Sequence, residues 1–308
     1  MAAVTAGMVK ELREMTGAGM MDCKKALANT DGDMDKAIEY LRENGMAKAA
    51  KKAGRIAAEG IVKVLVEGDK AAIVEVNSET DFVAKNADFN AYVDAVAAQA
   101  LNTTAADIDA FLAESWAAEP SKTVAEELAS QIAIIGENLK IRRFAQVKAE
   151  NGFVASYIHM GGKIGVLVDV ETDVINDDIK EMAKNVAMQA AALKPMYTSR
   201  DEVDADYIAK ETEILTAAAK NEKPDANDKI IEGMVKGRIS KELKEICLLD
   251  QVYVKAEDGK QSVSAYVAQV AKANNANIKI KGFVRFETGE GLEKKNEDFA
   301  AEVAAQLG

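Results

Sequence analysis

The sequence predicts an α+β protein in which a small helical bundle precedes a duplicated α+β core with antiparallel sheets. Apolar residues recur every three or four positions over residues 5 to 44, the spacing of helices that share a core. Beyond residue 60 the period changes to two in paired segments, as in β-hairpins. A unit of hairpin, helix and returning strand then occurs a second time, which indicates an internal duplication. An inserted helical hairpin and a C-terminal helix complete the expected fold.

The bulk composition is that of an ordinary folded protein. The chain has 308 residues, of which 48% are hydrophobic and only three are proline, so two or three packed units rich in helix are expected. Its net charge of −12 argues against a nucleic-acid-binding protein, because binding to the phosphate backbone depends on clustered Lys and Arg. We therefore expect no direct nucleic-acid partner.

Cysteine usage and the first residues indicate a bacterial-type cytoplasmic protein. Cys23 and Cys247 lie far apart and neither belongs to a C-x-x-C pair, which fits reduced thiols that act as small core residues. The opening "MAAVTAGMVKELREM" has acidic residues and no apolar run, so neither a signal peptide nor a transit peptide is expected. No later segment approaches membrane-spanning length, so no membrane partner is expected.

The first predicted unit, residues 1–55, contains the helical bundle. The breaks "TGAG" and "NTDGD" divide it into three helices, and Asp33 is the expected N-cap of the third. The basic segment "MAKAAKKAGRIAAEG" then marks the domain boundary as a solvated helix or linker. The positions expected to face inward are Val4, Met8, Leu12 and Met15, then Met20, Cys23 and Leu27, then Met34, Ile38 and Leu41.

Residues 56–150 contain the first copy of the repeat. The segment "IVKVLVEGDKAAIVEVN" alternates, turns at Gly68-Asp69 and alternates again, which predicts a hairpin. Thr123 and Glu126 make the capping box of a later helix, and "NLKIRRFAQVK" returns as a strand. The helical positions expected to face the core are Phe89, Val93, Val96 and Ala100, followed by Val124, Leu128, Ile132 and Ile135.

Residues 151–286 repeat this order. The segment "GFVASYIHMGGKIGVLVDVETD" predicts a second hairpin, and "LKP" ends the helix that follows it. The later strand "NIKIKGFVRFE" resembles the first returning strand. The apolar positions expected to be in phase are Ile179, Met182, Val186 and Ala190 on the helix, and Ile278, Ile280, Val284 and Phe286 on the strand.

Two helical segments lie outside the repeated unit. The insertion at about residues 187–247 predicts a long helical hairpin, and we expect it to be an association element because an exposed stripe on it is too apolar for a solvated arm. Residues 287–308 predict a C-terminal module, a helix whose apolar side docks on a partner. The hairpin stripe is Ile208, Leu215 and Ile231, and the apolar side of the last helix is Leu292, Phe299 and Val303.

The stretch "VNSETDFVAKN" places Phe82 in a polar turn, where large apolar side chains are rare. Val76 and the helical anchor Phe89 are 13 positions apart, whereas the corresponding Val170 and Ile179 of the second copy are 9 apart. The fold does not require the four extra positions, so the longer loop is a candidate for function. Phe82 is then either a lid on its own hairpin or an aromatic anchor for a partner.

Long motifs spread over nearly the whole chain resemble bacterial elongation factor Ts. They are "VKELREMTGAGMMDCKKAL", "KKAGRIAAEG", "TDFVAKN", "IGENLKIRR", "KIGVLV", "MVKGRISK" and "GFVRFETGEGLEKKNEDFAAEVAAQLG". The resemblance implies a guanine nucleotide exchange factor for the translational GTPase elongation factor Tu. It also implies that the N-terminal bundle is similar to a ubiquitin-associated domain, and it leaves open a homodimer or a heterotetramer formed through the helical hairpin or the core.

Partner-binding residues follow from the same resemblance. The loop implied to disturb the magnesium and phosphate site of the GTPase comprises Thr80, Asp81, Phe82 and Val83. Arg13, Met20 and Met21 are implied to bind from the N-terminal domain, with Met21 open between core and interface. Gly136, Glu137, Asn138 and His159 are implied to contact other parts of elongation factor Tu.

An exchange factor needs no chemistry of its own, and we expect no catalytic residue, metal or cofactor. It acts by stabilising the nucleotide-free GTPase more than the nucleotide-bound form. Two other classes remain. A ubiquitin-associated-like adaptor would bind protein partners without exchange activity. An enzyme that uses Cys23 or His159 is the other alternative. It is disfavoured because the sequence lacks a paired base, a phosphate loop and metal-ligand spacing.

Overall fold

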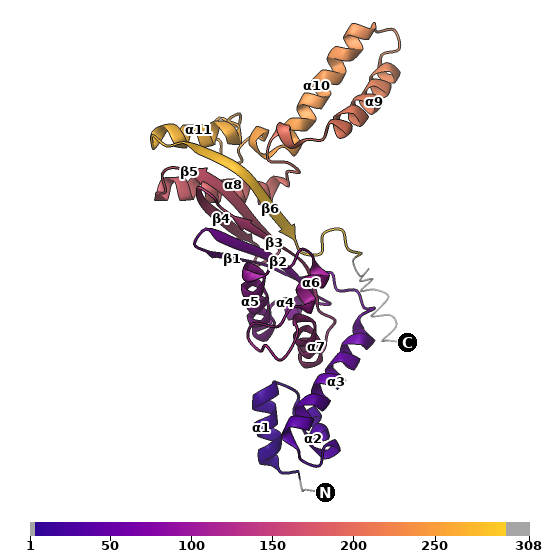
Figure 1. Cartoon of the computed structure of the whole chain (residues 1–308). Coiled ribbons are helices and arrows are strands. Elements are labelled where there is room, and N and C mark those ends of the chain that lie inside the picture. The colour runs from indigo at the N-terminus through magenta and orange to yellow at the C-terminus, as the bar shows by residue number, and fades with distance from the viewer. Residues whose placement is uncertain (1–3, 294–308) are drawn as a thin grey trace.

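The computed structural model describes residues 4–293 and confirms the predicted α+β class with two antiparallel sheets. In Figure 1 the helical bundle lies at one end, the helical hairpin of α9 (Ala205–Glu222) and α10 (Asp228–Ile246) at the other, and the two sheets lie between them. The first residues of the expected C-terminal helix, 289–293 with Leu292, form turns and not a helix, whereas Phe299 and Val303 fall outside the described residues. Within residues 4–293, no helix combines the length and the apolar character that a membrane crossing requires.

Three helices form the N-terminal bundle: α1 (Ala6–Thr16), α2 (Met20–Asn29) and α3 (Met34–Lys52). The predicted N-cap is confirmed, because the Asp33 carboxylate accepts the backbone N–H of Lys36. Leu12, Cys23 and Leu27 are fully buried in the small core.

The inward positions predicted for Met15 and Met20 are wrong, since each side chain is 59% exposed. On α1 the side chains that face the core include Leu12 and Thr16, which are four positions apart and so lie on the same side of the helix. Met15 lies outside this buried side. The Thr16 hydroxyl donates to the Leu12 carbonyl oxygen at 2.7 Å and needs no outside partner. Met20 begins α2, one turn before the first inward residue, Cys23.

The first half of the basic connector is helical, since α3 continues to Lys52 and packs against α7 (Val124–Ile135) of the first repeat. The two helices approach closely at Gly45. A Cβ atom at this position would lie 3.7 Å from the Ala129 carbonyl oxygen, which is van der Waals contact with the backbone of α7. Arg42 of α3 forms an ion pair with Glu126 of α7. The bundle is therefore joined to the core through helix packing rather than through a free linker.

The first repeat is built on a sheet of order β1-β2-β3, and the predicted Gly68-Asp69 hairpin turn is confirmed. Helices α5 and α7 carry the predicted apolar positions inward, and the Thr123–Glu126 capping box is present. The remaining elements of this unit are β1 (Glu59–Glu67), β2 (Lys70–Ser78), α4 (Asp81–Ala84), α5 (Ala87–Asn102), α6 (Ile108–Ala113) and β3 (Lys140–Lys148).

The second repeat has a sheet of the same order, β4-β5-β6, with α8 on its outer face. The predicted buried face of α8 is confirmed. Its elements are β4 (Gly152–His159), β5 (Ile164–Thr172), α8 (Asp177–Leu193), the short turns η1 (Arg200–Glu202) and η2 (Leu248–Asp250), α11 (Val263–Ala273) and β6 (Ile278–Glu287).

A β-bulge at the same place in each sheet supports the duplication. The register shifts between Glu75 and Val76 in the first sheet, and between Asp169 and Val170 in the second. Because a bulge inserts one unpaired residue, it reverses which side chains face inward. Hence Ile278 and Ile280 pack under α8, whereas Val284 and Phe286 pack between the two sheets, and the prediction that all four are in phase is wrong.

The two sheets meet face to face through apolar side chains such as Ile73 and Leu167. The tip of the second hairpin is also bonded to the first sheet, because the Val62 N–H donates to the Gly162 carbonyl oxygen at 2.7 Å. The chain after β6 stays attached as well, since the Gly289 N–H donates to the buried carboxylate of Glu75 at 2.8 Å.

The inserted hairpin consists of α9 (Ala205–Glu222) and α10 (Asp228–Ile246) and is shorter than predicted, because α8 belongs to the core as far as Leu193. Its predicted exposed stripe is wrong. Ile231 is only 3% exposed and packs with Leu215 between the two helices. The exposed apolar residues of the hairpin are Ile214 and Ile230.

The contact between α3 and α7 should weaken in acid. Hydrogen bonds from the Thr123 backbone and from Arg42 lower the pKa of Glu126. A carboxylate with a lowered pKa stabilises the fold above its unfolded pKa, and this contribution is lost as the pH falls through the folded value. We expect Glu126→Gln to lower the free energy of unfolding at pH 7, by urea titration. The difference in free energy of unfolding between the variant and the wild type should become smaller below about pH 4. A difference that does not change with pH would contradict this prediction.

Candidate functional site

The loop that contains Phe82 is an ordered turn of helix rather than an irregular connection. Thr80 caps α4, and its hydroxyl oxygen accepts the Val83 N–H at 3.4 Å. The N–H of Lys85 donates to the Phe82 carbonyl oxygen at 3.1 Å, and that of Asn86 to the Val83 carbonyl oxygen at 2.9 Å. The four extra positions of the first repeat thus fold into a compact, internally bonded element.

Phe82 points away from this element. Its side chain is 80% exposed, the highest exposure among the large hydrophobic residues that are exposed in the described chain. Val83 and Ala84, by contrast, pack against the core of the first repeat. Of the two alternatives, the lid on its own hairpin is therefore excluded, and Phe82 is an exposed aromatic side chain on an ordered loop.

A salt bridge flanks the aromatic ring. Lys85 Nζ lies 2.6 Å from Asp81 Oδ2 and 6.0 Å from the centre of the Phe82 ring. The hydrogen bond from Lys85 lowers the pKa of Asp81, so this carboxylate is charged at neutral pH. Both charged side chains are exposed, which leaves them available to a partner while they stay close to Phe82.

The carboxylate of Glu137 binds the first residues of the loop through three hydrogen bonds. Its Oε2 accepts the backbone N–H groups of Glu79 and Thr80, each at 3.0 Å, and its Oε1 accepts the Thr80 hydroxyl at 2.7 Å. The preceding residue, Gly136, ends α7 with φ 89°, a left-handed conformation that favours glycine. The predicted residues of "IGEN" and of the Thr-Asp-Phe loop are thus brought together, although they lie more than 50 positions apart in the sequence.

A second set of contacts supports this arrangement. The Asn138 N–H donates to Glu79 Oε1 at 2.6 Å, and its side-chain amide donates to the Arg55 carbonyl oxygen at 2.8 Å. Arg55 itself lies 3.4 Å from Glu79 Oε1. Sequence reasoning missed Glu79 and Arg55, because neither carries a local signal and their role arises from a pairing distant in the sequence.

His159 ends β4, and its Nδ1 lies 2.9 Å from the hydroxyl oxygen of Tyr157. It is exposed, as is the neighbouring Met160 at 72%. This hairpin tip lies beside the start of the loop, because Lys163 forms an ion pair with Glu59, and Glu59 pairs in the first sheet with Ser78, two positions before Thr80. His159 therefore lies on a hairpin tip that approaches the Phe82 loop.

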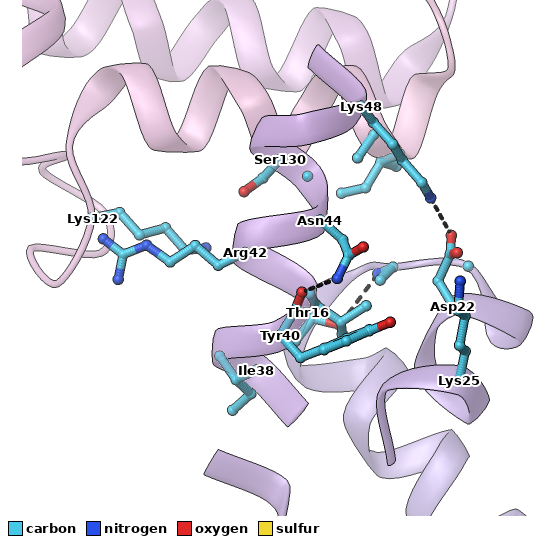
Figure 2. A pocket seen from close by; sticks show the side chains of 16 residues that line it. Thr16, Asp22, Lys25, Ile38, Tyr40, Arg42, Asn44, Lys48, Lys122 and Ser130 are labelled. Carbon is cyan, nitrogen blue, oxygen red and sulfur yellow. Dashed lines mark hydrogen bonds and ion pairs between the residues drawn. The ribbon is translucent and has the colours of Figure 1, made fainter. Parts of the chain in front are cut away.

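Arg13, Met20 and Met21 lie on the bundle, away from α4. Met21 is 74% exposed, so its placement in the core is wrong. Figure 2 shows a cleft of the same bundle, between α2, α3 and α7, where the Lys48 ammonium lies 2.8 Å from Asp22. The three predicted residues do not line this cleft; Arg13 is exposed near the end of α1, and Met20 and Met21 are exposed at the start of α2.

The structure gives no support to nucleophilic catalysis by the thiols. Cys23 and Cys247 are both fully buried, and burial raises the pKa of each thiol, the opposite of what a thiolate nucleophile requires. In the part of the chain that is described, no three His, Cys, Asp or Glu side chains are grouped so as to hold a metal ion.

Comparison with known proteins gives a consistent result over the whole chain. The family model described as Elongation factor TS matches residues 79–290, which include α4, the 136–138 turn and His159. The chain is 56% identical to elongation factor Ts of Clostridioides difficile (strain 630), over 100% of both sequences. It is 52% identical to that of Clostridium botulinum (strain Eklund 17B / Type B) and 51% identical to that of Clostridium tetani (strain Massachusetts / E88), over 99% of each sequence.

Proposed function

The chain belongs to the elongation factor Ts family, and from this premise we propose that it is a guanine nucleotide exchange factor for elongation factor Tu. The observation that carries the proposal is the exposure of Phe82. This aromatic side chain is 80% exposed, on a loop that has its own hydrogen bonds and is also bonded to Glu137. Exposed aromatic anchors of this kind dominate binding energy at protein interfaces. Pre-ordering of the loop lowers the entropy cost of inserting it into a partner.

The proposed mechanism is differential binding. The loop enters the GTPase near its magnesium and phosphate site, with Phe82 as the inserted group and the charged pair of Asp81 and Lys85 beside it. This contact is made better with the nucleotide-free GTPase than with the GDP-bound form, so binding of the factor raises the rate of GDP release. Rebinding of GTP reverses the preference and releases the factor.

We propose that the bundle and the second hairpin tip provide further contacts. Arg13, Met20 and Met21 are each exposed on the bundle, and His159 is exposed at the end of β4, on a hairpin tip whose Lys163 forms an ion pair with Glu59 of the first sheet. Residues 1–55, 56–150, 151–286 and 287–308 then act as four units of one binding protein. None of them needs a nucleophile, a metal or a cofactor for this role.

The test is the release of fluorescent GDP from elongation factor Tu under excess unlabelled nucleotide. We expect catalytic amounts of the protein to accelerate release, and the rate to saturate with GTPase concentration. If the protein binds elongation factor Tu but leaves the release rate unchanged, it is an adaptor and the proposal is wrong.

Association of the chain with a second copy is a further proposal, and it now depends on Ile214 and Ile230, which are 51% and 48% exposed on the hairpin. We expect the double variant Ile214→Lys, Ile230→Lys to reduce the molecular mass measured by light scattering. The buried Ile231 stays unchanged, so the hairpin keeps its own packing. Equal masses for variant and wild type would remove the hairpin as an association element.

A further inference from the structure

We infer that Glu137 is a positioning residue, which sets the orientation of the Phe82 loop instead of touching the partner itself. This inference deepens the proposed function and rests on it. The carboxylate of Glu137 already accepts three hydrogen bonds from Glu79 and Thr80, at 2.7 to 3.0 Å. Its two oxygens face its own chain, so little acceptor capacity remains for another protein.

The duplicated fold provides an internal control. Val76 pairs with Ile141 after the first bulge, and Val170 pairs with Ile280 after the second, which fixes the correspondence of the two copies. Counting from these pairs, Glu79 corresponds to Asp173, and Asn138 corresponds to Asn277. The hydrogen bond between them is repeated, since the Asn138 N–H donates to Glu79 at 2.6 Å and the Asn277 N–H donates to Asp173 at 2.8 Å.

The contact made by Glu137 is not repeated. By the same count, Glu137 corresponds to Ala276 and Thr80 corresponds to Val174, and neither of these two side chains can form a hydrogen bond. The second copy folds into the same strand order without this contact. The Asn138–Glu79 bond therefore belongs to the architecture of the repeat, whereas the Glu137–Thr80 contact occurs only where the chain carries the extra α4 turn.

The orientation of Glu137 is in turn tied to the N-terminal bundle. Lys52, the last residue of α3, donates to the carbonyl oxygen of Gly136. α3 begins inside the bundle and α7 ends at Gly136, so the turn that holds Glu137 lies where bundle and core are joined. A partner that binds the bundle and the Phe82 loop at once meets two surfaces connected by a short path of packed helices and hydrogen bonds.

The first measurement uses the free protein and reports the order of the loop. The N–H groups of Val83, Lys85 and Asn86 bond within the loop and do not touch Glu137. We expect Glu137→Ala to accelerate hydrogen exchange at these three amides by about tenfold or more, with little change in melting temperature. Glu137→Gln should stay close to wild type, because the amide keeps an oxygen for the two backbone donors and an N–H for Thr80. Unchanged protection in Glu137→Ala would overturn the inference.

The second measurement is a double-mutant cycle on stimulated GDP release. We expect Glu137→Ala to slow release roughly tenfold, and the double variant with Phe82→Ala to be no slower than Phe82→Ala alone, because Glu137 acts only through the loop. Additive losses would show that Glu137 contacts the partner directly and would overturn the inference. If Phe82→Ala alone released GDP normally, the proposed function would fail, whereas the exchange protection would still decide whether Glu137 orders the loop.

Discussion

Phe82→Ala is expected to keep the melting transition of the parent protein and to lose most of its stimulated GDP release. The side chain is 80% exposed, so its removal opens no cavity in the core and should change the free energy of unfolding by less than about 0.5 kcal/mol. Truncation of an aromatic anchor at an interface costs about 2–4 kcal/mol of binding, or about 30- to 1,000-fold. Part of that loss should appear as slower release of fluorescent GDP.

Phe89→Ala is the matched control, seven positions along the same chain. Phe89 is fully buried in the first repeat, so the same substitution there should lower the free energy of unfolding by about 3–5 kcal/mol. Phe82→Ala should lose stimulated GDP release and keep its stability, whereas Phe89→Ala should lose stability. If Phe82→Ala melted early, or if it exchanged GDP at the normal rate, the assignment of Phe82 as the inserted residue would be wrong.

The sequence predicted the elements of this fold well where one face of each element is buried. The buried face of α8 and the hairpin turn at Gly68-Asp69 both follow from regular hydrophobic spacing. The errors occur where regular spacing is interrupted. A bulge at Lys281 reverses the inward face of β6 beyond Ile280, which moves Val284 and Phe286 into the space between the sheets. No local sequence pattern indicates this bulge.

Exposure was harder to predict than periodicity. Ile208, Leu215 and Ile231 are apolar, but the sequence does not show that Leu215 of α9 and Ile231 of α10 pack against each other between the two helices. Met15 similarly lies close to the inward row of α1 without belonging to it. Spacing identifies which residues are apolar on a face, whereas burial depends on which element packs against that face.

The candidate site was found partly by internal comparison and partly by resemblance. Comparison of the two repeats identified the extra segment around Phe82, and the structure turns it into an ordered helical turn. Resemblance supplied Glu137 as a site residue but not the direction of its carboxylate. That direction depends on hydrogen bonds to Glu79 and Thr80, which are brought near by the folding of the whole first repeat.

The first bulge also carries a buried charge, the carboxylate of Glu75, which two partly exposed arginine side chains contact. The carboxylate of Glu75, with no exposed surface, accepts hydrogen bonds from Arg142 at 3.0 Å and from Arg143 at 2.6 Å. It also accepts the side-chain N–H of Asn77 at 3.1 Å and the backbone N–H of Gly289 at 2.8 Å. These donors come from β2, from β3 and from the segment after β6, so one carboxylate joins the first sheet to the end of the second repeat.

Glu75→Ala should therefore be among the most destabilising substitutions in the core. It removes the acceptor that two guanidinium groups and the Gly289 N–H share. Breaking a buried ion pair costs about 3–5 kcal/mol, and we expect a loss near the lower end of this range in urea unfolding, because both guanidinium groups are partly exposed and keep other acceptors. The control is Asp169, the corresponding residue of the second repeat, where burial raises the pKa and therefore disfavours the charged form. Asp169→Asn should leave stability at pH 7 unchanged or raise it. Equal losses at both positions would mean that the effect comes from the bulge itself and not from the charge network around Glu75.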